Sequence, residues 1–123
     1  MQYAVLCYHD EKVTCAWSKE QDDAVMAKLG VVMEKLERQG KLGPVAPLLP
    51  TTAATTLRKD HEPPLVIDGP FAETKEQLLG FYIIDCSNLE EALAITKDLG
   101  QANPGGAYEI RPVGLFFPGK ALS

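Results

Sequence analysis

The side chains best suited to acid–base chemistry lie at two predicted strand ends. Asp68 opens the segment Asp68-Gly69-Pro70-Phe71, directly after an apolar run at residues 65–67. Reactive groups are usually presented on loops at such ends, so Asp68 is a candidate general base or ligand-binding carboxylate. The alternative is a turn without chemistry. In that interpretation Asp68 closes an Asx-turn, Gly69 admits a positive φ, Pro70 fixes the exit direction and Phe71 anchors the loop in the core.

Tyr8 and His9 end another apolar run, at residues 3–8. A histidine titrates near neutral pH, so His9 is either a proton-transfer group beside a pocket or a solvated residue at a strand end. Arg111 either pairs with Asp68 or Glu109 or clamps an anionic substrate. The candidate catalytic residues are therefore Asp68 and His9, and the candidate ligand-binding residues are Tyr8, Gly69, Pro70, Phe71 and Arg111.

The sequence offers no pattern for a metal or an organic cofactor. The three cysteines, Cys7, Cys15 and Cys86, form no C-x-x-C pair, and neither His9 nor His61 lies at ligand spacing from them. A glycine-rich phosphate loop, a G-x-S-x-G elbow and a dinucleotide fingerprint are also missing. Any chemistry is therefore expected to be cofactor-free proton transfer or elimination on a small molecule.

Length and charge restrict the class of protein. A chain of 123 residues predicts one domain spanning residues 1–123. The net charge of −5, with scattered basic residues, argues against nucleic acid as a partner. No apolar run approaches the ~18 residues of a membrane span. The first residues lack the basic region of a signal peptide, so they are expected to form a strand of a cytoplasmic protein.

The elements that must position these residues are visible in the pattern. Ser18 and Gln21 form a capping box that begins a helix over residues 19–39, with an apolar stripe at Val25, Leu29, Val32 and Leu36. The acidic residues of this helix, Asp22 among them, are expected on its solvated face. The other expected elements are a polar loop at 10–17, an edge or bulged strand at 42–49, a hairpin from 51–58 and 65–67, a strand at 81–86, a helix from Asn88 that stops at Gly100, and a strand at 108–113.

This order predicts an α+β fold: a ferredoxin-like βαββαβ plan with an extra hairpin strand, an antiparallel sheet and both helices on one face. The strands at 3–8 and 81–86 are apolar on both sides. The face without helices would then expose an apolar patch. A second copy packed on it by a two-fold contact is the simplest cover, so a homodimeric α+β barrel is expected.

The segment at residues 68–78, followed by Gly80-Phe81-Tyr82-Ile83-Ile84-Asp85, resembles the signature of the DGPF branch of the YCII-related family. Residues 51–58 and Glu109-Ile110-Arg111-Pro112 resemble further strands of that family. The resemblance implies the same ferredoxin-like dimer. In smaller family members a histidine on the first helix and a nearby aspartate are a proposed catalytic pair, but this sequence has no histidine at residues 19–39.

What the resemblance implies about function leaves alternatives open. Some YCII-related proteins resemble lyases that remove chloride from chlorinated aromatic intermediates, and others occur beside or fused to sigma factors. The first hypothesis is therefore a small-molecule-binding protein with cofactor-independent lyase or proton-transfer activity. The alternatives are a regulatory or protein-interaction module associated with transcription machinery, and a structural dimer whose signature segment serves folding alone.

Overall fold

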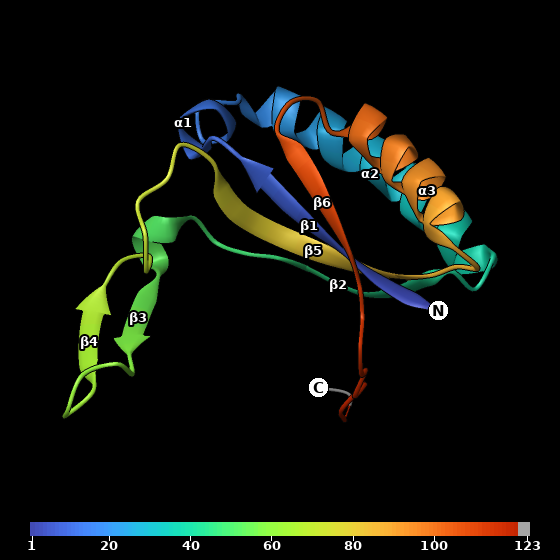
Figure 1. The fold of residues 1–123 in the computed structure, drawn as a ribbon. Coiled ribbons are helices and arrows are strands. Elements are labelled where there is room, and N and C mark those ends of the chain that lie inside the picture. The colour runs from blue at the N-terminus through green and yellow to red at the C-terminus, as the bar shows by residue number, and fades with distance from the viewer. Residues whose placement is uncertain (121–123) are drawn as a thin grey trace.

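A computed structural model describes residues 1–120 and contains a four-stranded antiparallel sheet in the order β2-β5-β1-β6 (Figure 1). The strands of this sheet are β1 (Gln2–His9), β2 (Leu42–Pro47), β5 (Gln77–Asp85) and β6 (Ala107–Pro112). A separate hairpin contains β3 (Thr55–Arg58) and β4 (Leu65–Asp68). The helices are α1 (Glu11–Thr14), α2 (Lys19–Arg38), α3 (Leu89–Ala102) and the short 3-10 helix η1 (Thr51–Ala53). The predicted ferredoxin-like plan with an extra hairpin is confirmed.

The long helices begin where their capping residues predict. Ser18 Oγ accepts a hydrogen bond from the Gln21 backbone N–H at 3.1 Å, and Gln21 Oε1 accepts one from the Ser18 N–H at 2.9 Å, so the capping box of α2 is complete. Asn88 caps α3 by accepting from the Glu91 N–H. The predicted stop at Gly100 is wrong, because α3 continues to Ala102, whose side chain is buried and holds the last turn in place. No helix within the described chain is long and apolar enough to cross a membrane.

The segment after β1 and the strand at the sheet edge follow the sequence pattern to different degrees. The expected polar loop at residues 10–17 contains α1, a single helical turn whose N-terminus is capped by the Asp10 carboxylate accepting from the Lys12 N–H. The expected edge strand is confirmed as β2, which pairs with β5 on one side alone and shifts register between Leu42 and Val45. The prolines of this strand therefore lie where missing N–H donors are tolerated.

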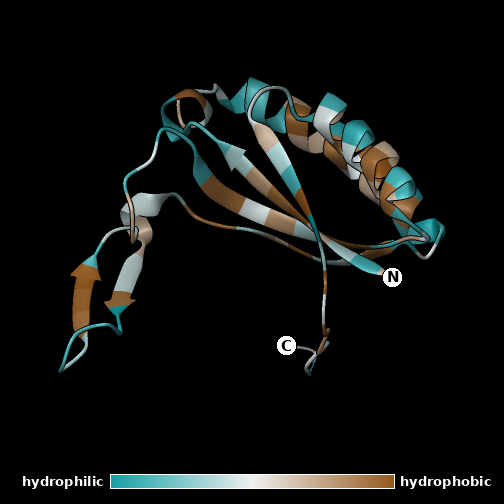
Figure 2. Ribbon diagram, in the orientation of Figure 1, coloured by the Kyte–Doolittle hydropathy of each residue, from teal (hydrophilic) through white to brown (hydrophobic). Residues whose placement is uncertain are grey.

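The core fills the layer between the helices and the sheet. It contains buried apolar side chains from β1, α2, β5 and α3: Tyr3, Val5, Leu29, Leu36, Tyr82, Ile84, Cys86, Ala92, Ile95, Leu99 and Ala102. Hydrophobic and hydrophilic residues are interspersed along α2 and α3, as Figure 2 shows. The buried apolar ones, such as Leu29, Leu36 and Leu99, belong to the core against the sheet. In this layer α2 packs against α3 and β2, and α3 packs against β6.

In the described part of the chain, both long helices lie on one face of the sheet and the opposite face carries none (Figure 1). In β1, Val5 is fully buried under the helices, whereas its neighbours Ala4 and Leu6 point to the other side and are half-buried. In β5, Ile84 is fully buried and Ile83 is half-buried on the same open face. The predicted two-sided apolar strands are thus present, and we call this uncovered side the open face.

The β3-β4 hairpin stands away from the main sheet, and residues 54–71 are called the arm below (Figure 1). Its large apolar side chains are exposed: Leu57, Leu65, Val66, Ile67 and Phe71. The expectation that Phe71 anchors its loop in the core is wrong, since Phe71 is 76% exposed. The C-terminal segment, residues 113–120, leaves the body on the same side as the arm (Figure 1).

Candidate functional site

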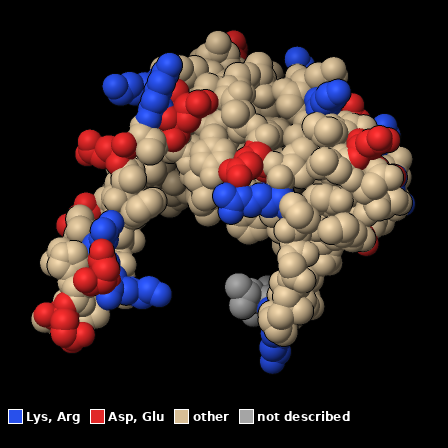
Figure 3. Space-filling model, in the orientation of Figure 1, with Lys and Arg blue, Asp and Glu red and all other residues tan. Residues whose placement is uncertain are grey.

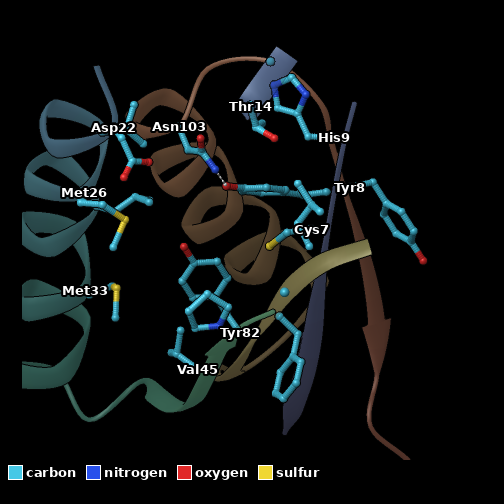
Figure 4. A pocket seen from close by; sticks show the side chains of 18 of the residues that line it. Cys7, Tyr8, His9, Thr14, Asp22, Met26, Met33, Val45, Tyr82 and Asn103 are labelled. Carbon is cyan, nitrogen blue, oxygen red and sulfur yellow. Dashed lines mark hydrogen bonds between the residues drawn. The ribbon is translucent and has the colours of Figure 1, made fainter. Parts of the chain in front are cut away.

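A cavity of about 420 Å³ lies between α2 and the helix-facing side of the sheet (Figure 4). Apolar side chains form most of its walls, among them Trp17, Val25, Met26, Leu29, Met33 and Val45. Polar side chains that also line it are Cys7, His9, Thr14, Asp22, Tyr82, Asn103 and Tyr108. The exposed lining residues Asp22, Met26 and Gly105 place its opening, called the mouth below, between the first turns of α2 and the loop at residues 103–106.

His9 lies at the end of β1 and lines this cavity, the first of the two positions considered for it. Its Nδ1 accepts a hydrogen bond from the Asp10 backbone N–H at 2.8 Å, so Nδ1 carries no proton in this arrangement. Its Nε2 lies 3.3 Å from the Pro104 carbonyl oxygen and therefore donates to it. The ring also meets Trp17 edge to face, at 6.0 Å between centroids. The His9 side chain thus connects the loop at residues 103–106 to the end of β1.

Two glycines let that loop lie against the end of β1. Gly105 and Gly106 have φ angles of +85° and +74°, a region that favours glycine. A Cβ on Gly105 would lie 2.6 Å from His9 Nε2, and a Cβ on Gly106 would overlap the Tyr8 carbonyl oxygen. The close approach that shapes the cavity wall therefore requires glycine at both positions.

Two phenols and a thiol form the sheet-side wall. The Tyr108 hydroxyl oxygen accepts a hydrogen bond from Asn103 Nδ2 at 2.9 Å, and Figure 4 shows the Tyr82 hydroxyl pointing toward α2. Within residues 1–120 the Tyr82 hydroxyl has no hydrogen-bond partner. Burial raises the pKa of Cys7 to about 12, and burial also raises the pKa values of Tyr82 and Tyr108. All three groups are therefore protonated at neutral pH.

Asp22 is a cavity residue that the sequence reasoning missed. It was expected on the solvated face of its helix, but its carboxylate lies at the mouth (Figure 4). The signal was present in the spacing, because Asp22 precedes Val25 by three residues and Leu29 by seven. These separations place all three on one face of a helix. The apolar stripe of α2 thus ends in a carboxylate where the helix reaches solvent.

Tyr8 and Arg111 were expected beside the same pocket, and their side chains lie elsewhere. The backbone of Tyr8 contributes to the cavity, but its ring points away, toward the open face (Figure 4). Arg111 lies on β6 with its side chain exposed, and its Nε donates to a Glu109 carboxylate oxygen at 2.8 Å. Of the two pairings considered for Arg111, the structure contains the one with Glu109.

The remaining predicted residues, Asp68, Gly69, Pro70 and Phe71, lie at the root of the arm, and none of them lines the cavity. The structure therefore does not bring Asp68 and His9 together within one chain. The expected Asx-turn is also replaced: the Gly69 N–H donates to the Ala54 carbonyl at 2.8 Å, and the Thr56 hydroxyl donates to the Gly69 carbonyl at 2.8 Å. In the described chain the exposed Asp68 carboxylate accepts no hydrogen bond.

A second set of contacts joins α1 to the segments before and after the arm. The Glu11 carboxylate accepts from the Thr51 N–H at 2.8 Å and from the Thr51 hydroxyl at 2.6 Å. The Glu11 N–H in turn donates to Gln77 Oε1 at 2.9 Å. No sequence motif marks these contacts, which join residues 40 and 66 positions apart. They tie α1, above the cavity, to the segment that leads into the arm.

The three cysteines are free thiols. Within residues 1–120 no three His, Cys, Asp or Glu side chains are grouped so that they could hold a metal ion. What the cavity offers is hydrogen bonding at a phenol pair, a histidine and one carboxylate, set in apolar walls. Such a lining can bind and orient a small organic molecule and can exchange protons with it.

Comparison with known proteins places the chain in a family. The family model described as the YCII-related domain matches residues 1–116. The chain is also 61% identical, over 124 residues, to an uncharacterized protein of Rhizobium meliloti (strain 1021), and the match covers all of both chains. The match to the family model includes the strands, the helices and every residue that lines the cavity. The chain belongs to the YCII-related family.

Proposed function

We propose that this protein binds a small organic molecule in the cavity between α2 and the sheet. The observation that carries the proposal is the cavity itself, about 420 Å³ in volume, with apolar walls and a few polar groups gathered at the mouth and the sheet side. Ligand sites in proteins typically measure roughly 300–1,000 Å³ and combine apolar walls with a few polar groups that orient the ligand. Assignment to the DGPF branch rests on the segment at residues 68–78 and is part of the proposal.

The chemistry proposed for the site is cofactor-independent proton transfer or elimination. His9 and Asp22 supply the imidazole and the carboxylate of the cavity lining, the groups that most often exchange protons in proteins. His9 acts as a base only after its Nε2 leaves the Pro104 carbonyl, so ligand binding must displace that 3.3 Å contact. Asp68 takes part only if a second copy brings its arm to the cavity, because Asp68 lies outside the cavity of its own chain.

Binding is tested by filling the cavity. Val45→Phe adds a ring at a half-buried lining residue that points toward α2 (Figure 4). We expect this variant to weaken binding of 2-acetylnaphthalene at least about tenfold, or about 1.4 kcal/mol. Val31→Phe, the same change at a residue of α2 that is 69% exposed, is the matched control. Equal affinities for Val45→Phe, Val31→Phe and the unchanged protein would contradict a ligand site in this cavity.

We propose further that the protein is a homodimer whose two open faces pack together. Support comes from the half-buried apolar side chains of the open face, such as Leu6 and Ile83, which no helix or strand among residues 1–120 covers. Figure 3 shows a hollow below the sheet, between the arm and the C-terminal segment. A two-fold contact would place the sheet of one copy in the hollow of the other.

The arm gives this proposal independent support. Val66 and Phe71 are 65% and 76% exposed, and in the C-terminal segment Phe117 is 80% exposed. A two-stranded hairpin is marginally stable in water by itself, so apolar residues on both of its sides call for a partner surface. A second copy seated in the hollow would meet both the arm and the C-terminal segment.

Light scattering at micromolar concentration tests the dimer. The unchanged protein should show about twice its chain mass of 13.4 kDa, and Leu6→Asp should halve that value because it charges the open face. Ala94→Asp, on the exposed side of α3, is the control and should leave the mass unchanged. A soluble monomer for the unchanged protein would refute the dimer.

The alternative function is a regulatory or protein-interaction module, associated with transcription machinery. The exposed apolar residues of the arm favour it over a purely structural dimer, because they are free to contact a different protein. A monomeric protein that binds no small molecule would support this alternative. A cytoplasmic location is also part of the proposal, and it rests on the three free thiols, which are typical of a reducing compartment.

A further inference from the structure

The side chains that line the cavity carry negative charge and no positive charge from lysine or arginine, within the described residues. Asp22 is its one acidic residue, and no lysine or arginine lines the cavity in the described part of the chain. His9 adds no positive charge in the observed arrangement, because its Nδ1 accepts a backbone N–H. The lining groups therefore offer a ligand one negative charge and no compensating positive one.

Neighbouring cations do not neutralise Asp22. Lys19, one turn away, pairs with Asp23 at 3.5 Å instead, and among residues 1–120 no ion pair or hydrogen bond involves the Asp22 carboxylate. Asp22 lies in the first turn of α2, where the helix dipole favours a negative charge. Its charge is thus held at the mouth and is available to a ligand.

Hydrogen-bond donors lie on the sheet side of the same cavity. The Tyr108 hydroxyl accepts from Asn103 and keeps its own proton free to donate, and the Tyr82 hydroxyl has no partner in the described residues. The two rings lie 6.4 Å apart between centroids, and both residues line the cavity. The Tyr82 hydroxyl points toward α2 (Figure 4). Their raised pKa values keep both as donors at neutral pH. Such a pair suits an acceptor such as a carbonyl oxygen.

From this arrangement we infer the class of ligand: an apolar compound that carries no negative charge and presents a hydrogen-bond acceptor to Tyr82 and Tyr108. The inference rests on the proposed ligand site and deepens it. A carboxylate entering the cavity would lose its hydration, find no basic partner and face Asp22 at the mouth. An amine held at the mouth would instead be attracted by Asp22. Organic anions are therefore the class that the site rejects.

A matched series of naphthalene compounds separates these effects by calorimetry near neutral pH. The series consists of 2-acetylnaphthalene (neutral with an acceptor), naphthalene (neutral without one), 2-naphthoate (anionic) and 2-naphthylmethylamine (cationic). We expect 2-naphthoate to bind at least about tenfold more weakly than 2-acetylnaphthalene, and the amine to bind at least as tightly as naphthalene. Anion binding equal to or tighter than that of the ketone would overturn the inference.

Variants assign the discrimination to named groups. Asp22→Asn should improve binding of 2-naphthoate several-fold and weaken the amine, whereas Asp23→Asn, on the same turn but outside the cavity, should change neither. Tyr82→Phe should weaken 2-acetylnaphthalene by about fivefold to tenfold and leave naphthalene unchanged, because it removes one hydrogen-bond donor. An unchanged preference in Asp22→Asn would show that Asp22 does not set the charge selection.

The outcomes separate this inference from the proposed function. Binding of all four compounds without regard to charge, abolished by Val45→Phe, would keep the ligand site and refute its charge selection. Failure of every neutral and cationic compound to bind would count against the ligand site and the inference together.

Discussion

Gly106→Ala tests whether the loop at residues 103–106 must lie against β1 to form the cavity wall. Gly106 has a φ of +74°, and a Cβ there would overlap the backbone oxygen of Tyr8 and lie 3.1 Å from the His9 ring. A side chain could rotate away from such a contact, but a strand carbonyl cannot. The loop must therefore move, and it would take Asn103 and the Pro104 carbonyl with it.

The expected loss of unfolding free energy in Gly106→Ala is the sum of two costs. A left-handed conformation costs a residue other than glycine about 1–2 kcal/mol. Displacing the loop also strains the end of the β1-β6 ladder, where Tyr8 pairs with Ala107, at about 1 kcal/mol for a lost hydrogen bond. Gly40→Ala is the matched control, because Gly40 has a φ of +69° and a Cβ there would meet nothing within 4 Å, so this variant incurs the first cost alone. We expect a loss of about 2–3 kcal/mol for Gly106→Ala and about 1–2 kcal/mol for Gly40→Ala, a difference of about 1 kcal/mol.

Urea unfolding near neutral pH measures both free energies, and calorimetry with 2-acetylnaphthalene measures the cavity. Gly106→Ala should also weaken that compound, whereas Gly40→Ala, at the far end of α2, should not. Equal losses of stability in the two variants, with unchanged binding, would refute the account of the loop as a cavity wall.

Three further predictions concern single side chains. Cys15 should react with iodoacetamide at mildly alkaline pH while Cys7 stays unmodified, as mass spectrometry of the modified peptides would show, because burial raises the pKa of Cys7 to about 12. Burial also raises the pKa of Tyr82, and the unfolded chain has pKa values of 9.0 at Cys7 and 10.0 at Tyr82. The contribution of both groups to stability is therefore complete below these unfolded pKa values and is lost as the pH rises above them, so the urea midpoint should fall above about pH 9. A midpoint that does not change with pH would contradict this prediction. Asp68→Ala should change the free energy of unfolding by less than about 0.5 kcal/mol. Thr56→Val should lower it by about 1 kcal/mol, because this change removes the hydrogen bond to the Gly69 carbonyl. A larger loss for Asp68→Ala than for Thr56→Val would indicate that Asp68 closes an Asx-turn after all.

The fold could be predicted from the sequence because its signals are local. The capping box of Ser18 and Gln21 marks the start of α2 within a single turn, and the two-sided apolar pattern marks β1 and β5 as the inner strands. The prediction that the helix stops at Gly100 was wrong, because the burial of Ala102 outweighs the cost of a glycine inside α3. Local propensity gives way there to tertiary packing.

The site was predicted in part, and the reason is geometric. The strand-end position of His9 made a place beside a pocket one of two alternatives, and the structure has His9 in the cavity lining. Asp68 ends a strand as well, but β4 belongs to the separate hairpin, and no local pattern says which strands share a sheet. Asp22 was missed because a charged residue on a helix is ordinarily solvated, although its spacing from Val25 and Leu29 placed it on the cavity side.

The methionine methyl groups give the most direct test of a ligand site between α2 and the sheet. The chain has three methionines, of which Met26 and Met33 line the cavity and Met1 lies outside it. With carbon-13 in these methyl groups, titration with 2-acetylnaphthalene should shift the NMR signals of Met26 and Met33 and leave that of Met1 in place. Saturable binding that shifts Met1, or that leaves Met26 and Met33 unmoved, would show that the ligand binds elsewhere and would contradict the proposed function.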